Sequence, residues 1–205
     1  MESAFRLLYE GGIIMIPLLI TSVISLAVVI ERSLFLRRSR IVQPEIVEMI
    51  NNIKKLSDIE NLMARLRNFT GPFVNIIRVG IENRNMPKEY VREAILDQGR
   101  QEARILERGL VILETAAGIA PLLGLLGTVL GMIEVFEVIS KQGVGQTQSL
   151  SGGISQALIT TVVGLSIAIP VLVAYNYFVN KVEELVLEIE KHSNKLLLKL
   201  EKITE

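Results

Sequence analysis

Three stretches of this chain are long, apolar and free of charge. Residues 11–30 and 115–133 each contain no Asp, Glu, Lys or Arg, and a third uncharged run covers residues 142–180. The polar beginning of that third run predicts a loop, so its span is placed at 153–177. A helix of about 20 apolar residues crosses roughly 30 Å of hydrocarbon. The pattern therefore predicts an all-α integral membrane protein with three transmembrane helices at 11–30, 115–133 and 153–177.

The residues between the first two spans predict several shorter helices. Pro44 and Pro72 each stand where a helix begins, since proline is favoured at the first helical position. Ser57 and Glu60 have the spacing of a capping box for another helix. These signals predict a cytoplasmic helical region at residues 31–114.

The second and third spans are expected to continue beyond the membrane as helices. No strong helix breaker lies between Pro87 and the second span, which predicts one long helix from Pro87 to about Phe136, kinked at Pro121. After the third span, apolar residues keep helical spacing through residues 178–205, which predicts a C-terminal cytoplasmic helix. Both helices would then extend into the cytoplasm.

Charge sets the orientation of the spans. Residues 31–114 hold fifteen Lys and Arg and residues 181–205 hold five, whereas residues 1–30 and 134–153 hold one each. Basic residues concentrate on the cytoplasmic side of membrane proteins. We therefore expect a periplasmic N-terminal segment at 1–10, a periplasmic loop at 134–152 and a cytoplasmic C-terminus. A cleaved signal peptide is disfavoured because the bases follow the first span and that span is long.

Composition argues against catalytic and nucleic-acid-binding functions. The 22 basic and 22 acidic residues give no net charge, and the mean hydropathy is +0.44. No surplus of bases is present to neutralise phosphates. There is no Cys and one His, which excludes thiolate sites and multi-His zinc sites. No phosphate loop or paired-carboxylate motif is present either. We expect no enzyme activity, no metal and no cofactor, and we expect His192 to be structural.

Small residues recur at helical spacing in the second and third spans but not in the first. Small side chains let membrane helices approach closely. The first span is therefore expected to face lipid, and the other two to form an inner ring made by several copies. The predicted packing and kink positions are Pro121, Gly124, Gly127, Gly131, Ala157, Gly164 and Pro170.

Polar side chains in the same two spans are candidates for lining a hydrated pore. They are Thr128, Gln156, Thr160 and Thr161. Polar groups deep in hydrocarbon usually face a bundle interior or a wet cavity. A second interpretation stays open, because membrane threonines often bond to the carbonyl four residues earlier and small stripes often serve packing alone.

Two motifs resemble the ExbB/TolQ/MotA family of proton-channel motor subunits. Residues 121–131 (PLLGLLGTVLG) are similar to its second-span motif, and residues 153–170 (GISQALITTVVGLSIAIP), followed by Tyr175 and Asn176, are similar to its third-span motif. Three spans are similar to the ExbB and TolQ branches, since MotA has four. The resemblance implies a homo-oligomeric ring, a pentamer, in the bacterial inner membrane, whose second and third spans line a central pore.

The resemblance also implies partners and a mechanism. An ExbD-like or TolR-like single-span subunit with an Asp in its span would occupy the pore. Ion passage would drive motion that a TonB-like or TolA-like protein carries to the outer membrane. Thr128 and Thr161 match threonines that face the pore near that Asp. Gln156 departs from the family, which commonly has Glu there, so neither pore span holds an acid.

Two functions follow as hypotheses. The first is a proton-channel stator subunit for TonB-dependent transport or a Tol-type envelope function. The second is a non-conducting oligomeric membrane scaffold for a single-span partner, which Gln156 favours because an amide cannot carry a proton as a carboxylate does. The residues do not decide whether the chain serves a TonB-dependent or a Tol-type system. They also do not decide whether the conducted ion is a proton or sodium.

Overall fold

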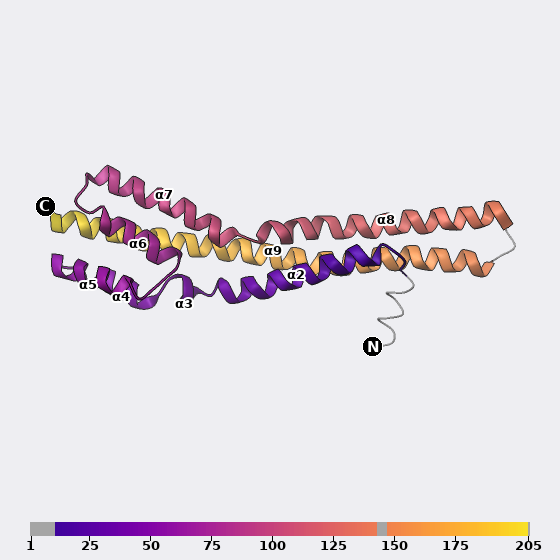
Figure 1. Cartoon of the computed structure of the whole chain (residues 1–205), viewed down its shortest axis with the longest axis horizontal. Coiled ribbons are helices and arrows are strands. Elements are labelled where there is room, and N and C mark those ends of the chain that lie inside the picture. The colour runs from indigo at the N-terminus through magenta and orange to yellow at the C-terminus, as the bar shows by residue number, and fades with distance from the viewer. Residues whose placement is uncertain (1–10, 143–146, 205) are drawn as a thin grey trace. The chain divides into compact units, whose positions relative to one another are not determined.

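A computed structural model describes residues 11–142 and 147–204, which are helical without a strand (Figure 1). The predicted N-terminal segment at 1–10 and part of the predicted loop lie outside these residues. The helices are α2 (Met15–Phe35), α3 (Arg38–Ile41), α4 (Pro44–Asn52), α5 (Leu56–Leu66), α6 (Pro72–Glu82), α7 (Lys88–Glu107), α8 (Leu110–Gln142) and α9 (Thr147–Thr204).

Three of these helices are long and apolar enough to cross a membrane. The candidate segments are Met15–Phe35, Leu110–Lys141 and Ser151–Ile203, with mean hydropathies of 1.9, 2.0 and 2.4. Each contains most or all of one predicted span. The prediction of an all-helical protein with three candidate membrane helices is therefore confirmed.

The chain divides into two compact units. The span unit is Met1–Glu31 with Gly109–Asn176, and the charged unit is Arg32–Arg108 with Tyr177–Glu205. Helix α9 supplies residues to both. Twenty of the 22 basic residues belong to the charged unit, which is why we give it that name.

The span unit is held together by contacts among α2, α8 and the first half of α9. Met15 and Leu18 of α2 form a buried cluster with Ala120 of α8 and Ala168 of α9. Leu18 and Ala120 are fully buried. Two alanines leave room for the larger α2 side chains, so α2 begins packed against the other two helices (Figure 1).

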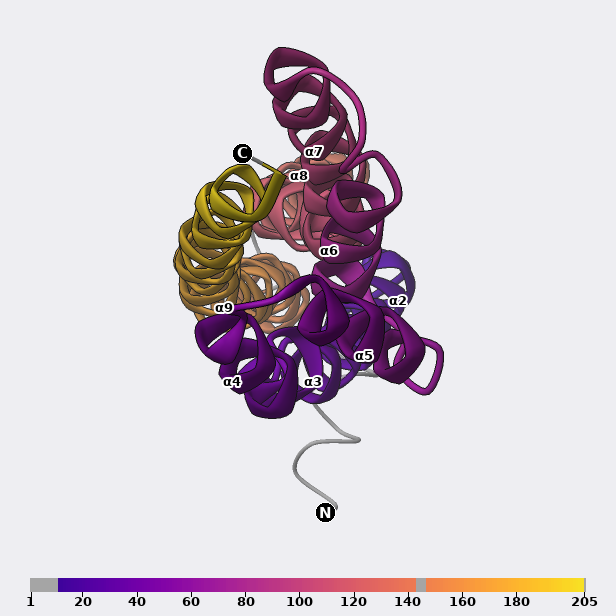
Figure 2. The same cartoon turned by 90° about the vertical axis from the view of Figure 1, so that its left-hand side faces the viewer.

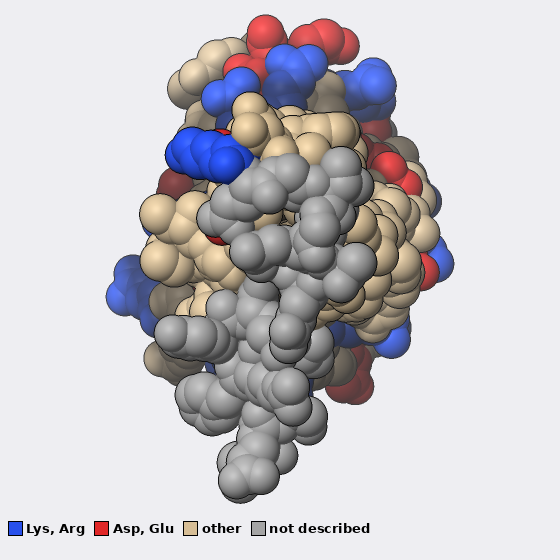
Figure 3. All heavy atoms as spheres, turned by 90° about the vertical axis from the view of Figure 1, so that its right-hand side faces the viewer, with Lys and Arg blue, Asp and Glu red and all other residues tan. Residues whose placement is uncertain are grey.

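Large apolar side chains remain exposed on all three helices of the span unit. Examples are Ile20, Val23 and Leu26 on α2, Leu122, Leu125 and Ile133 on α8, and Val162, Ile169 and Val173 on α9. In the end-on view of Figure 3, much of the described surface is uncharged. Large apolar side chains exposed together on membrane-length helices mark contact with lipid or with another protein. Helices α8 and α9 therefore keep apolar faces available beyond their mutual contact.

The charged unit is built around α6. Phe73, Ile77 and Ile81 of this helix are fully buried. Figures 1 and 2 show α6 beside α5, α7 and the C-terminal part of α9. A Cβ placed on Gly80 would lie 3.0 Å from Ile95 Cδ1 on α7 and 3.3 Å from Leu196 Cδ2 on α9, so a glycine lets these helices approach.

Helix starts at proline were predicted well, and two other boundaries were not. Helices α4 and α6 begin at Pro44 and Pro72, as predicted. The capping box at Ser57 is wrong, because α5 begins at Leu56 and the Asp58 carboxylate accepts from the backbone N–H groups of Lys54 and Lys55 instead.

The single helix expected from Pro87 to Phe136 is also wrong. Helix α7 ends at Glu107, and α8 begins at Leu110. Gly109 between them has φ +86°, a left-handed conformation that glycine adopts at little cost. The apolar pattern continues across this break, which is why spacing alone did not reveal it.

Candidate functional site

Small residues bring α8 and α9 into backbone contact in the span unit. A Cβ on Gly124 would lie 2.9 Å from the Thr160 carbonyl oxygen and 3.0 Å from Thr161 Cα. A Cβ on Gly164 would lie 2.6 Å from the Ala120 carbonyl oxygen. These are main-chain atoms, which cannot rotate away as a side chain can. The contact therefore requires glycine at both positions.

The contact continues through the rest of the predicted stripe. A Cβ on Gly131 would lie 3.0 Å from Ala157 Cβ, and one on Gly127 would overlap the Thr160 side chain. Gly124, Gly127, Gly131, Ala157 and Gly164 are all buried. Helices α8 and α9 run on through Pro121 and Pro170, which lie inside them.

Three threonine hydroxyls gather around one backbone carbonyl in this contact. Thr128, Thr160 and Thr161 have their Oγ1 atoms 3.3, 3.3 and 3.2 Å from the Gly124 carbonyl oxygen. Thr128 Oγ1 is also 2.9 Å from the Ala157 carbonyl oxygen and 2.5 Å from Thr161 Oγ1. We call Thr128, Thr160 and Thr161 the threonine cluster.

The members of the threonine cluster differ in exposure. Thr160 is 1% exposed and donates to the Ala157 carbonyl oxygen at 2.8 Å, so it lies inside the helix contact. Thr128 and Thr161 are only partly buried. Thr128 and Thr161 therefore each keep part of their surface exposed, whereas Thr160 does not.

Gln156 lies apart from the threonine cluster. A Cβ on Gly12 would overlap the Gln156 side-chain nitrogen, so the Gln156 amide lies against the backbone before α2. Gly12 has φ +69°, which also favours glycine. This contact was not predicted, because two glycines at residues 11 and 12 carry no sign of a partner far along the sequence.

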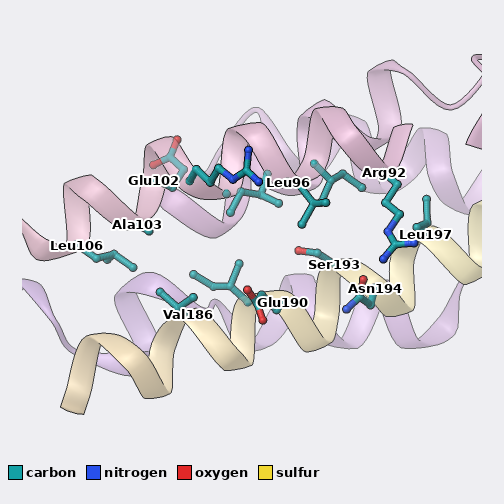
Figure 4. A pocket seen from close by; sticks show the side chains of 15 residues that line it. Arg92, Leu96, Glu102, Ala103, Leu106, Val186, Glu190, Ser193, Asn194 and Leu197 are labelled. Carbon is teal, nitrogen blue, oxygen red and sulfur yellow. The ribbon is translucent and has the colours of Figure 1, made fainter. Parts of the chain in front are cut away.

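The charged unit contains a cavity lined by buried polar side chains (Figure 4). It has a volume of about 310 Å³ and lies between α7 and α9. Its buried Glu102 carboxylate accepts from Asn75 Nδ2 and Gln98 Nε2, both at 2.8 Å. Ser193 is 3% exposed, and its hydroxyl has no hydrogen-bond partner within the described residues. No base among the described residues is hydrogen-bonded to this hydroxyl, which is the contact that activates a serine nucleophile.

No metal site accompanies this cavity in the part of the chain that the structure describes. No group of three or more His, Cys, Asp and Glu residues there is arranged to hold an ion. The threonine cluster is a polar site between two apolar helices, and its members hydrogen-bond within that contact.

One known protein family matches more than half of this chain. The model of the MotA/TolQ/ExbB proton channel family matches residues 68–191, which include the whole threonine cluster. The chain belongs to the MotA/TolQ/ExbB proton channel family. Family membership and the three apolar helices make it a multi-pass membrane protein.

Relatives come from both the ExbB and TolQ branches of the family. An ExbB-like biopolymer transport protein of Synechocystis sp. is 32% identical over 173 residues, covering 82% of this chain and 81% of the relative. The biopolymer transport protein ExbB of Aquifex aeolicus is 37% identical over 114 residues, covering 56% and 76%. The Tol-Pal system protein TolQ of Haemophilus influenzae is 28% identical over 186 residues, covering 84% and 82%. The chain therefore has a general ExbB/TolQ-type character.

Proposed function

We propose that this chain is the ion-conducting stator subunit of an ExbB/TolQ-type motor in the bacterial inner membrane. With an ExbD-like or TolR-like partner it would convert proton motive force into work for TonB-dependent transport or a Tol-type envelope function. The observation that carries the proposal is the contact between the Thr128 and Thr161 hydroxyls across α8 and α9, at two residues that are only partly buried.

Hydrogen-bond counting supports a role for this pair in moving or holding a proton. Each hydroxyl donates once and can accept twice. One hydroxyl donates to the other across 2.5 Å, and the hydroxyl that accepts can donate its own proton to a backbone carbonyl, Thr128 to Ala157 or Thr161 to Gly124. Each oxygen then keeps at least one free lone pair. A protonated carboxyl group or a water outside the chain could donate to them. The pair is thus suited to receive a proton donor at the exposed face of the helix contact.

The hydroxyls do not titrate near neutral pH, so the charge carrier must come from elsewhere. Residues 115–133 and 142–180 contain no acid. Gln156 is an amide and cannot carry a proton as Glu can. We infer that an Asp in the single span of the partner supplies the titratable group. One charge that crosses 100 mV releases about 2.3 kcal/mol, which sets the energy of each step.

The assembly and orientation belong to the same proposal. Several copies, in a pentamer, would place α8 and α9 around a central pore that holds the partner, with α2 toward lipid. The N-terminus and the loop before α9 would be periplasmic, and the charged unit would be cytoplasmic. The exposed apolar faces that remain on α8 and α9 support contacts between copies. We propose no enzyme activity.

Substitution of the hydroxyls tests the proposal in vesicles. The chain is reconstituted with its single-span partner, and ion flux is measured under an imposed membrane potential. We expect Thr128→Val and Thr161→Val each to lower the ion flux at least about tenfold. Tenfold is a lower limit, because the loss of one positioned proton-transfer group can slow proton transfer by more than that. Thr128→Ser and Thr161→Ser keep the hydroxyl and should restore most of the flux.

One threonine and one serine elsewhere on the same helices provide matched controls. Thr115 on α8 and Ser166 on α9 each donate to a carbonyl four residues earlier and are exposed. Thr115→Val and Ser166→Ala should leave flux unchanged. Equal flux in the wild type and the Thr128→Val and Thr161→Val variants would contradict the proposed role.

A non-conducting scaffold is the second candidate function. The buried Thr160 and the Gln156 contact with Gly12 favour it, because both polar groups serve packing within the chain. In that case the single-span partner co-purifies with the chain, and reconstituted vesicles show no flux above that of empty vesicles.

A further inference from the structure

A wide groove on the charged unit is lined by several basic side chains that have no part in the proposed ion path. One wall runs from the end of α2 through α3 to α4, and the other is α9 from Tyr177 to His192. Its volume is about 880 Å³. We call it the basic groove, and all its lining residues belong to the charged unit.

Positive charge dominates the basic groove. Its lining includes Arg37, Arg38, Lys181 and Lys191 but only two acids, Glu48 and Glu188. Arg38 and Glu188 pair through two hydrogen bonds, one of them 2.7 Å long from Arg38 Nε.

The other bases of the groove form fewer ion pairs with acidic side chains. Lys181 pairs with Glu184, whose side chain is 67% exposed, at 2.8 Å. Within the described residues no ion pair involves Arg37 or Lys191, so the groove keeps a surplus of positive charge facing solvent.

Chain position puts both walls of the groove next to the membrane. Arg37 follows the last residue of the first uncharged stretch, Ile30, by seven residues, and Lys181 is the first charge after the third stretch. Tyr177, 62% exposed, lines the groove one turn before Lys181. Aromatic side chains with a polar tip favour the depth of lipid headgroups. The groove therefore begins at headgroup level.

Neutral side chains of the groove suit the rest of a lipid molecule. Ser39 and the Tyr177 phenol offer hydroxyl donors for phosphate oxygens. Leu36, Val42 and Val47 give the floor an apolar part, and Leu34 on the last turn of α2 is 49% exposed. A soluble anion would need the bases and hydroxyls alone, whereas a lipid also uses the apolar part.

We propose that the basic groove binds the headgroup of an anionic phospholipid of the cytoplasmic leaflet. The phosphodiester lies between Arg37 and Lys181, with Lys191 adding charge from the next turns of α9. Basic pockets beside membrane helices on the cytoplasmic side hold such headgroups. The proposal depends on the orientation of the chain in the membrane and not on ion conduction, so either one can fail alone.

Native mass spectrometry of the full-length chain in detergent tests this site. The delipidated protein is offered phosphatidylglycerol and phosphatidylcholine with identical acyl chains, and the bound lipids are counted. The wild type should retain phosphatidylglycerol preferentially. The double variant Arg37→Gln/Lys181→Gln should bind it roughly 10- to 30-fold more weakly, from about fivefold per base at an anionic surface.

Two further variants make the result specific. Arg67→Gln/Lys202→Gln removes two exposed bases of the charged unit outside the groove and should bind like the wild type. Arg37→Lys/Lys181→Arg preserves the charge and should keep the preference, which separates lost charge from lost folding. Far-UV circular dichroism checks the helix content of each variant.

Four outcomes would overturn the proposal. Three are equal retention of the two lipids by the wild type, undiminished phosphatidylglycerol binding by Arg37→Gln/Lys181→Gln, and loss of the preference in a folded charge-preserving variant. The fourth is complete displacement of phosphatidylglycerol by inorganic phosphate at the same concentration, which would assign the groove to a soluble anion.

Discussion

At the scale of single residues, Arg38, Glu188 and His192 form a small group of interacting side chains in the charged unit. The Arg38 guanidinium lowers the pKa of Glu188 by hydrogen bonding. Burial lowers the pKa of His192, against the opposing effect of Glu188, whose carboxylate is 3.9 Å from Nε2. His192 Nδ1 is buried without a partner in the described part of the chain, and its ring meets Phe73 edge-on. Burial outweighs the effect of Glu188, so the neutral imidazole is favoured.

Protonation of His192 should destabilise the charged unit. The imidazole has a pKa near 6.5 when unfolded and a lower one when folded, so its contribution to stability is present above about pH 6.5 and is lost as the pH falls. Glu188 stays ionised in this range because its pKa is lowered. Thermal unfolding of the wild type should therefore shift to lower temperature between about pH 7.5 and pH 5.5.

The variant His192→Gln provides the comparison. It lacks the titrating group, so the shift over the same pH range should be smaller than in the wild type. Equal shifts in the two proteins, measured by far-UV circular dichroism in one detergent, would assign the pH dependence to other groups.

Sequence reasoning at this scale found residue types but not their distances. The sequence marked Thr128 and Thr161 as pore candidates, yet it could not show that their hydroxyls meet 2.5 Å apart across two helices. It grouped Thr160 with them, although burial separates Thr160 from the exposed pair. Helical periodicity defines a face within one helix, and partners on another helix depend on tertiary packing.

At the scale of elements, the contact between α8 and α9 depends on glycine. Gly124 and Gly164 face each other with their Cα atoms against main chain. The small-residue pattern predicted this close approach. The apolar runs predicted the three candidate membrane helices. The break between α7 and α8 was missed, because Gly109 acts through a backbone angle that leaves the apolar pattern unchanged.

Substitution of one α8 glycine should separate the two helices. In Gly124→Ala the new Cβ meets backbone atoms of α9 at 2.9 and 3.0 Å, and overpacking of this kind costs about 1–3 kcal/mol. The free energy of unfolding, measured by denaturant titration in mixed micelles, should fall by about that amount.

Gly118→Ala is the matched control on the same helix. No heavy atom lies within 4 Å of a Cβ at Gly118, so the change should cost nothing and add up to about 1 kcal/mol of helix propensity. A Gly124→Ala protein as stable as Gly118→Ala would show that the close contact contributes little.

At the scale of the whole molecule, the distribution of charge and the absence of cysteine make the topology testable. The chain has no native Cys, so single-cysteine variants are unambiguous. In intact cells, Lys141→Cys should react with a membrane-impermeant maleimide. Asn68→Cys and Lys202→Cys should react only after the inner membrane is opened. Labelling of Asn68→Cys from outside would reverse the proposed orientation.

In the proposed motor, a partner's acid completes an ion path that this chain lines. Ion flux into vesicles is measured with the chain alone, with an ExbD-like or TolR-like partner, and with that partner carrying Asp→Asn in its span. Because residues 115–133 and 142–180 contain no acid, we expect flux only with the unaltered partner. Flux through the chain alone, or equal flux with the Asp→Asn partner, would contradict it.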